Sequence, residues 1–216
     1  MSEAVRLCGL GMRVPEETTL ESLIALGECR EVFCRVEDPR YYRWLASQGI
    51  RLKRPKNAAQ IVAAARNAGG PVGLAVWGHP QFNSRFAREA EIALRDAGLP
   101  YRVYGSISPV GSAFARSVSF LGGEYGCLGL RCLDLESLLS DASVAATRLP
   151  LIVFSEKSPA ARWTALFGWL RERYPASHEA RVYHCGSDAE VLTPVGKLKA
   201  KGFSGAILLV PPSARG

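Results

Sequence analysis

Apolar runs and helix-like patterns alternate along the first half of the chain. The apolar runs are short and rich in β-branched or aromatic residues, which predicts strands at residues 4–8, 31–36, 72–77 and 101–104. Helical signals lie between and after them, from Thr18-Thr19, from Asp38-Pro39, over residues 56–68 and 84–97, and through Phe114 and Val118. Because strands that alternate with crossover helices pair in parallel, this half predicts a mainly parallel sheet with flanking helices.

The pattern changes after Gly122-Gly123. Further strands are predicted at residues 125–133, 149–154, 181–184 and 206–210, and helices at residues 135–139 and 159–174. The last helix has its apolar face at Trp163, Leu166, Phe167 and Leu170. We therefore expect an α/β fold of two α/β subdomains: residues 1–122, with the mainly parallel sheet, and residues 123–216, with a mixed sheet.

Three glycine-bearing loops each come directly after a predicted strand. They are Gly9-Leu10-Gly11, Gly78-His79-Pro80 and Gly105-Ser106-Ile107-Ser108. The carboxyl ends of parallel strands lie along one edge of a sheet, where backbone amides and helix starts converge on ligands. We expect the three loops to line one pocket, because glycine lets the backbone approach a ligand closely. The alternative is that these glycines serve only the strand-to-helix turns.

Two nucleotide-binding motifs are incomplete or missing. The first loop begins a GxGxxG pattern, but Val14 stands where the third glycine belongs, which disfavours a nicotinamide cofactor. The sequence contains no GxxxxGK[ST] pattern, which disfavours a phosphate- or nucleotide-binding protein that uses the same turns.

Composition narrows the classes of partner. The 216-residue chain carries a net charge of +7, but its arginines are scattered, so we expect no nucleic-acid partner. Its apolar runs are far shorter than the roughly 20 residues that cross a bilayer, so we expect no membrane partner and place the protein in the cytoplasm. Six cysteines without a CxxC pair indicate buried reduced thiols. His184 and Cys185 point to opposite faces of a predicted strand, so we expect no metal site there.

Five segments together carry a family resemblance. They are VRLCGLGMRVPEETTLESL, VGLAVWGHPQF, YRVYGSISPVGSAFA, YGCLGLRCLDLESLL and SGAILLVPP, in this order over nearly the whole chain. The chain resembles the tetrapyrrole (corrin/porphyrin) methylase superfamily, and within it the branch that contains borosin-type peptide N-methyltransferases. The resemblance implies a two-domain α/β protein, usually a homodimer, that binds S-adenosyl-L-methionine in a cleft between the domains and releases S-adenosyl-L-homocysteine.

The resemblance also assigns cofactor contacts. In the first half they lie in the three loops and are Gly9, Leu10 and Gly11, then Gly78, His79, Pro80 and Phe82, then Ser106, Ile107 and Ser108. In the second half, Phe154 matches a strand position near the adenosine, and Gly205-Ala206-Ile207 matches a closing strand near the adenine.

Two departures from the family pattern bear on the methyl acceptor. His79 stands where the porphyrin and corrin enzymes usually carry an acidic residue, and Tyr104 where they usually carry a proline. His79 fits the peptide-methylating branch, but that branch has a Tyr/Arg-rich segment between its second and third strands, whereas residues 49–60 contain no tyrosine. The acceptor is thus open between a small molecule, a tetrapyrrole-like macrocycle and a peptide. The alternative function is a regulatory or partner module that binds S-adenosylmethionine without turnover.

Candidate catalytic residues follow from the chemistry of a sulfonium donor. Because the methyl group is already activated, the protein need only align the acceptor and remove a proton where there is one. Imidazole is the usual general base near neutral pH, so His79 is the candidate, with capping of the next helix as the alternative. A tyrosine such as Tyr41, Tyr42 or Tyr104 would align the acceptor, and Arg13 would pair with an anionic group unless it is solvated.

Overall fold

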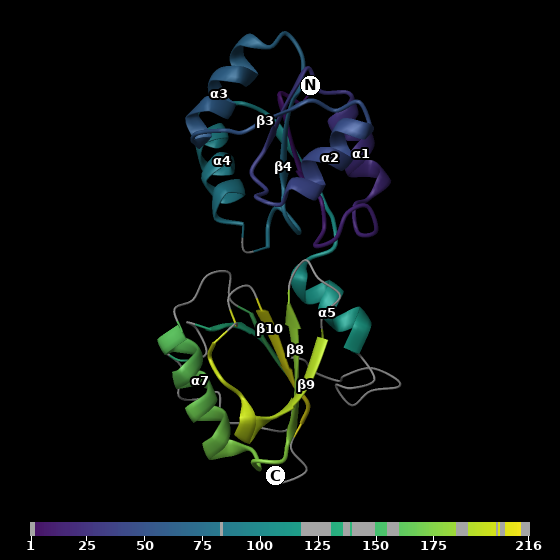
Figure 1. Cartoon of the computed structure of the whole chain (residues 1–216). Coiled ribbons are helices and arrows are strands. Elements are labelled where there is room, and N and C mark those ends of the chain that lie inside the picture. Colours follow the sequence, from purple (N-terminus) through teal and green to yellow (C-terminus); the bar gives the residue numbers. More distant parts are fainter. Residues whose placement is uncertain are drawn as a thin grey trace. The chain divides into compact units, whose positions relative to one another are not determined.

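Two compact units make up the chain. The computed structural model describes residues 3–82, 84–117, 131–135, 139, 150–154, 160–184, 190–201, 203 and 206–212. Contacts divide the chain into Met1–Pro109 and Val110–Gly216 (Figure 1). The boundary that the sequence predicts, between residues 122 and 123, lies outside the described residues and stays a prediction. Each unit combines a β-sheet with helices, which confirms the predicted α/β fold.

The first unit is built on a parallel sheet, as predicted. Its strands are β1 (Val5–Gly9), β2 (Glu31–Cys34), β3 (Leu52–Lys53), β4 (Val72–Val76) and β5 (Tyr101–Tyr104). They lie in the order β3-β2-β4-β1-β5, and all neighbouring pairs are parallel. β3 is too short to give a periodic signal, which is why the sequence pattern does not indicate it. The order makes β4, β1 and β5 adjacent, so the loops that follow these strands start side by side.

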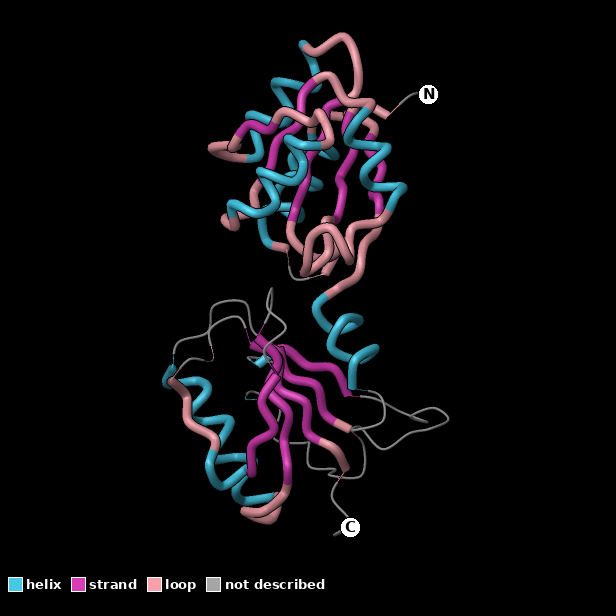
Figure 2. Tube along the Cα trace, turned by 45° about the vertical axis from the view of Figure 1, so that its right-hand side comes forward, coloured by secondary structure: helices cyan, strands magenta, loops and turns pink. Residues whose placement is uncertain are grey.

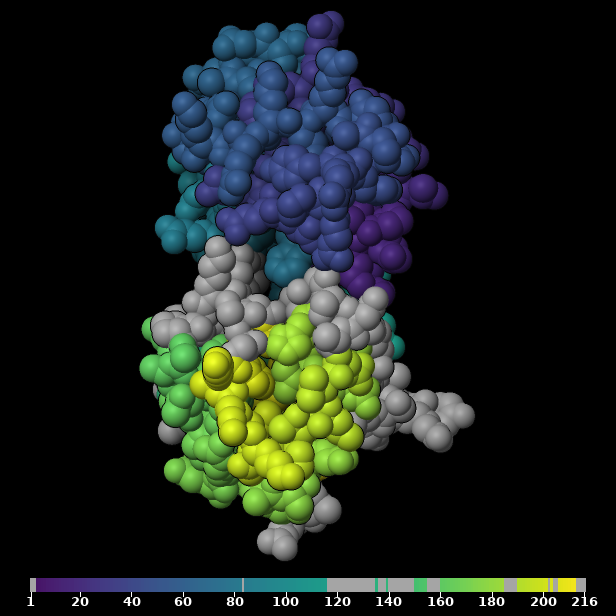
Figure 3. Space-filling view, in the orientation of Figure 1, coloured from purple at the N-terminus to yellow at the C-terminus, as the bar shows by residue number. Residues whose placement is uncertain are grey.

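Four helices cover the two faces of this sheet. They are α1 (Leu20–Gly27), α2 (Pro39–Ser47), α3 (Ala58–Asn67) and α4 (Arg85–Asp96). Leu26 of α1 and Leu45 of α2 pack with Cys8 on one face, whereas Ile61 of α3 and Leu94 of α4 belong to the core on the other (Figure 2). Residues of α2 and of the loops beside it form part of the face of the first unit that Figure 3 shows. The strands of this unit are therefore covered on both faces.

Each of these helices begins at a side-chain cap. The cap residues are Thr19, Asp38, Asn57 and Ser84, and each accepts a hydrogen bond from a backbone N–H two or three residues further on. Such a cap satisfies one of the N–H groups that a helix start leaves without a partner, and contributes about 1 kcal/mol. The caps of α1 and α4 fix where the first and second loops end.

The second unit has a mixed sheet, as predicted. Its strands are β6 (Arg131–Asp134), β7 (Leu151–Phe154), β8 (Glu179–His184), β9 (Glu190–Pro194) and β10 (Ala206–Val210), in the order β6-β7-β10-β8-β9. β6 and β7 are parallel, whereas the other neighbouring pairs are antiparallel. The sequence pattern does not indicate β9, because this short strand ends in a proline and exposes Val191 and Leu192.

Helices pack on both faces of this second sheet. α7 (Ala160–Arg173) buries its predicted apolar face, Trp163, Leu166, Phe167 and Leu170, in one core. α5 (Pro109–Ser117) places Ala113 in the core of the opposite face, and the 3₁₀ turn η1 (Val195–Lys197) follows β9. The predicted helix at residues 135–139 lies largely outside the described residues.

Candidate cofactor site in the first unit

The three glycine loops meet at Gly9. A Cβ atom on Gly9 would lie 2.6 Å from the carbonyl oxygen of Gly78, 2.7 Å from the Cβ of Ser106 and 3.0 Å from the Cδ of Pro80. Atoms of the second and third loops therefore pack directly against the first loop, and no side chain fits at this position. The structure brings the loops together at one edge of the parallel sheet.

Backbone hydrogen bonds join the first and second loops. Gly78 donates its N–H to the carbonyl oxygen of Gly11 over 2.9 Å, and the two residues form an isolated antiparallel bridge. Leu10 donates its N–H to the carbonyl oxygen of Val76 over 3.0 Å. Gly11 and Gly78 have φ angles of +71° and +66°, a left-handed conformation that glycine adopts without steric cost. The course of both loops thus depends on glycine.

Hydroxyl groups join the start of α1 to the first and third loops. The carbonyl oxygen of Gly105 accepts hydrogen bonds from Thr19 Oγ1 at 3.1 Å and from Ser22 Oγ at 3.3 Å. Thr18 Oγ1 donates to the carbonyl oxygen of Leu10 over 2.7 Å. The segment that caps α1 therefore holds both loops, and the hydroxyls occupy carbonyl groups that would otherwise need water.

Glu17, which no sequence motif marks as a functional residue, also joins the first and third loops. Its carboxylate accepts hydrogen bonds from the backbone N–H of Met12 at 2.9 Å and from Arg13 Nε at 3.0 Å. Ser106 Oγ donates to its backbone carbonyl oxygen over 2.8 Å. Arg13, a candidate for pairing with an anionic ligand, is thus bound to a carboxylate of the chain itself. Opposite charges four residues apart are the sequence signal that could have found this pair.

His79 stabilises a turn inside the second loop. Its Nδ1 accepts a hydrogen bond from the N–H of Gln81 at 3.2 Å, and its carbonyl oxygen accepts one from the N–H of Phe82 at 3.0 Å. A backbone amide can only donate, so a neutral imidazole in this geometry carries its proton on Nε2. Nε2 lies 3.1 Å from the position of a Cβ on Gly105. The ring therefore lies between the second and third loops, and α4 is capped by Ser84 instead.

The sequence pattern described as Tetrapyrrole (Corrin/Porphyrin) Methylases matches residues 5–200. The chain belongs to this family. The match confirms the resemblance at the level of the superfamily and the predicted activity class, S-adenosylmethionine-dependent methyl transfer. A search among curated proteins finds no match.

Solved structures of methyltransferases share this fold. The uroporphyrin-III-C-methyltransferase of Thermus thermophilus is 25% identical, with a TM-score of 0.70 over 96% of this chain and 91% of that one. The methyltransferase CobJ is 19% identical, with a TM-score of 0.78 over 99% and 95%. A Thermus thermophilus uroporphyrin-III C-methyltransferase complexed with S-adenyl homocysteine is 20% identical, with a TM-score of 0.68 over 98% and 93%. The last two likenesses establish the fold alone.

In this family member, two of the three candidate tyrosines hold the backbone near the loops. Tyr41 donates its hydroxyl hydrogen to the carbonyl oxygen of Gly11 over 3.2 Å and accepts a hydrogen bond from Trp77 Nε1 at 3.1 Å. Tyr42 donates to the carbonyl oxygen of Cys34 over 3.0 Å. Burial raises the pKa of Tyr41, and raises that of Tyr42 to about 12. Both hydroxyls stay protonated at neutral pH, and both bond to the protein.

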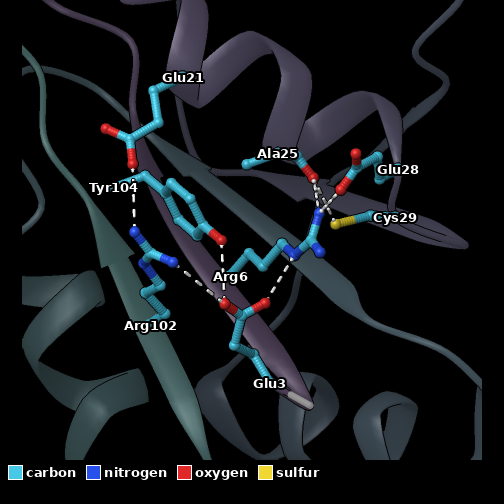
Figure 4. Close-up of polar contacts among 8 residues, drawn as sticks. All are labelled: Glu3, Arg6, Glu21, Ala25, Glu28, Cys29, Arg102 and Tyr104. Carbon is cyan, nitrogen blue, oxygen red and sulfur yellow. Dashed lines mark hydrogen bonds and ion pairs between the residues drawn. The ribbon is translucent and has the colours of Figure 1, made fainter.

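The third tyrosine, Tyr104, turns its hydroxyl away from the loops. It donates to Glu3 Oε1 over 3.2 Å, and the Arg102 guanidinium lies over its ring at 4.9 Å from the centroid (Figure 4). Burial and the hydrogen bond to Glu3 raise the pKa of Tyr104. Glu3 precedes the start of β1, whereas the loops follow the ends of the strands. The structure therefore does not bring this hydroxyl to the loops.

The predicted contacts of the second unit lie on two paired strands. Phe154 of β7 is the cross-strand neighbour of Ile207 of β10. Ala206 and Ile207 are buried, and Phe154 is half-buried. Gly205 lies outside the described residues. Within this unit, the assigned positions form one short stretch of sheet.

Three of the six cysteines have side chains that the structure describes, and all three are buried or half-buried. Cys8, Cys29 and Cys34 are unbridged, and burial raises the pKa of each, that of Cys29 to about 11. In the described part of the chain, no group of His, Cys, Asp and Glu has the makings of a metal site. Nor does a helix in those ranges have the length and apolar character of a membrane span. The other three cysteines lie where side chains are not described.

Proposed function

We propose that the three glycine loops of the first unit bind S-adenosylmethionine and that the chain transfers its methyl group to a small-molecule acceptor. The convergence of the loops at Gly9 carries this proposal, because it brings three glycine-bearing turns together at the carboxyl edge of a parallel sheet, where such folds bind ligands. The cofactor contacts proposed in these loops are Gly9, Leu10, Gly11, Gly78, His79, Pro80, Phe82, Ser106, Ile107 and Ser108. Phe154 and Gly205-Ala206-Ile207 stay assigned to the adenosine by the resemblance.

Methyl transfer from an activated donor needs few catalytic side chains. S-adenosylmethionine supplies an activated methyl group, so the protein contributes by holding donor and acceptor in line, which is worth several kcal/mol. Loops joined by backbone hydrogen bonds and by side-chain hydroxyls suit this task, since they lose little entropy on binding. The bond from Gln81 favours His79 as part of the loop scaffold over His79 as a general base.

The identity of the acceptor belongs to the proposal as well. The family and the uroporphyrin-III-C-methyltransferase that shares its fold favour a small molecule of tetrapyrrole-like chemistry. A peptide acceptor of the borosin type has weaker support, because residues 49–60 lack the tyrosines that this branch uses. The homodimer and the cytoplasmic location are likewise proposed, and light scattering of the purified protein tests the first.

Calorimetry with a matched pair of glycine variants tests the site. We expect the wild type to bind S-adenosylmethionine and S-adenosylhomocysteine with micromolar affinity, about −8 kcal/mol, and not to bind ATP. Gly9→Ala places a methyl group 2.6 Å from a backbone oxygen and should weaken binding at least tenfold. Gly27→Ala at the end of α1 meets no atom within 4 Å and should bind like the wild type. Equal affinities for the two variants would place the cofactor elsewhere.

Turnover is tested separately with a labelled methyl group. Small-molecule and peptide fractions of a cell lysate are offered in parallel to the wild type and to Gly9→Ala. Label that enters the small-molecule fraction and depends on Gly9 supports the proposal. Label in peptides would favour the peptide acceptor, and tight binding with no transfer to either fraction would favour the regulatory module.

A further inference from the structure

Among the charged residues whose side chains the structure describes, Glu17 is the one that is buried. Its side chain is 5% exposed, and it stands between the first glycine loop and α1. A carboxylate removed from water costs free energy unless charges and hydrogen bonds compensate for it. The partners of Glu17 therefore indicate what its burial achieves.

These partners lie within residues 12–17, the segment that follows the first loop, so their contacts fold this segment into a compact turn. Oε2 accepts from the N–H of Met12, and Oε1 pairs with Arg13 Nε. The N–H of Glu17 in turn donates to the carbonyl oxygen of Arg13 over 3.0 Å. Hydrogen bonds to an ionised carboxylate are about twice as strong as neutral ones, so the charge of Glu17 holds this segment more firmly than a neutral side chain would.

Glu17 also touches the first and third loops directly. A Cβ on Gly11 would lie 2.6 Å from both the Cβ and the carbonyl oxygen of Glu17, so the first loop packs against its backbone. The same carbonyl oxygen accepts the hydrogen bond from Ser106 Oγ. A shift of Glu17 would therefore move the first loop relative to the third.

We infer that Glu17 is a positioning residue of the cofactor site. Its buried carboxylate fixes the segment that follows the first glycine loop, and its backbone carbonyl oxygen bonds to Ser106 of the third loop. This inference rests on the proposed function and adds a residue that the family resemblance does not assign. Glu17 acts through the loops, so cofactor affinity depends on a charge that the cofactor does not touch.

Glu17→Gln is the decisive variant. It keeps the shape and one oxygen for Met12, but it removes the charge and turns an N–H₂ group toward Arg13. We expect the Kd for S-adenosylhomocysteine to rise about tenfold, as when a neighbour that orients a binding group is lost. The KM for S-adenosylmethionine should rise more than kcat falls, because the loops position the donor and do not react. Glu16→Gln, at the exposed neighbouring glutamate, removes the same charge from the surface and is the matched control.

Hydrogen exchange of the ligand-free protein separates positioning from direct binding. In Glu17→Gln, we expect faster exchange in peptides that cover residues 9–18 and also residues 105–108, with no such change in Glu16→Gln. If Glu17→Gln does not fold, Arg13→Gln serves as the second variant, because it removes the ion pair by changing the more exposed of its two partners. It should raise the Kd for S-adenosylhomocysteine about threefold.

The outcomes distinguish this inference from the proposed function. Wild-type protein that binds neither S-adenosylmethionine nor S-adenosylhomocysteine overturns the proposed function, and this inference with it. Wild-type binding together with an unchanged Kd in a folded Glu17→Gln overturns the inference alone. So does a raised Kd without faster exchange at residues 105–108, because Glu17 would then act on the ligand directly.

Discussion

The two ends of β1 are held by different means. At its carboxyl end the loops meet through backbone atoms and small side chains, and a Cβ on Gly9 has no room. At its amino end, charged side chains connect β1 to its neighbours. Arg6 Nε pairs with Glu3 Oε2 at 3.1 Å, and Arg6 Nη1 donates to the carbonyl oxygen of Ala25 over 3.0 Å (Figure 4). The carboxyl end therefore depends on close packing of backbone atoms, whereas the amino end depends on pairs of charged side chains.

The charged network ties three elements of the first unit together. Arg6 of β1 also pairs with Glu28 at the end of α1, and Arg102 of β5 approaches Glu3 at 3.6 Å and Glu21 at 3.4 Å. Arg6 itself is 14% exposed, so its charge depends on these partners. We call the carboxyl end of β1, where the glycine loops meet, the loop end, and its amino end, where Glu3 and Arg6 pair, the network end. We expect changes at the loop end to alter ligand affinity, and changes at the network end to alter only the free energy of unfolding.

The largest effect is expected from Gly11→Ala at the loop end. Gly11 has a φ of +71°, and its Cβ would lie 2.6 Å from atoms of Glu17, so strain and overlap add. We expect a loss of about 3 kcal/mol in the free energy of unfolding and a large loss of S-adenosylhomocysteine affinity, measured by denaturant titration and calorimetry.

Gly69→Ala is the matched control for this variant. Gly69 has a φ of +61° but would meet no atom within 4 Å, so the change carries backbone strain alone. Gly69→Ala should lower the free energy of unfolding by about 1 kcal/mol and leave the affinity for S-adenosylhomocysteine unchanged. Similar results for the two glycines would mean that contact between the loops does not matter.

The next effect is expected at the other end of β1, from Arg6→Met. Loss of the guanidinium removes one ion-pair partner from Glu3 and one hydrogen-bond donor from the carbonyl oxygen of Ala25, which should lower the free energy of unfolding by about 2 kcal/mol. Arg102→Met, at a side chain that is 58% exposed, should cost about 0.5 kcal/mol or less. Neither change should alter the Kd for S-adenosylhomocysteine. A weaker ligand affinity in Arg6→Met would break the division between the two ends.

The sequence predicts the loops better than it predicts the contacts that hold them. Strand runs and helix caps are local signals, so the parallel sheet and the place of each glycine loop could be predicted. Whether Gly9 touches Ser106 depends on the strand order, which brings β1 beside both β4 and β5 and has no local signature. The contact between Glu17 and Ser106 and the hydrogen bond from Tyr104 to Glu3 could not be predicted for the same reason, because each joins segments that lie far apart in the sequence.

The smallest expected effect is a change in pH dependence at the network end. Burial raises the pKa of the Glu3 carboxyl, but hydrogen bonds from Tyr104 and Arg6 outweigh it, so this pKa is lower in the folded than in the unfolded state. Glu3 therefore contributes stability above the unfolded pKa of 4.5, and this contribution is lost as the pH falls through the folded pKa.

Tyr104→Phe removes one of the two hydrogen bonds that lower this pKa. The fall in Tm between pH 7 and pH 3 should then be smaller than in the wild type by about 1–2 °C, because less of the Glu3 contribution remains to be lost. Tyr101→Phe, on the same strand but the opposite face, should show the wild-type dependence. If Tyr104→Phe also shows the wild-type pH dependence, the Glu3 carboxylate draws its stabilisation from Arg6 and Arg102, and the hydroxyl of Tyr104 adds packing but no electrostatic support at this end of β1.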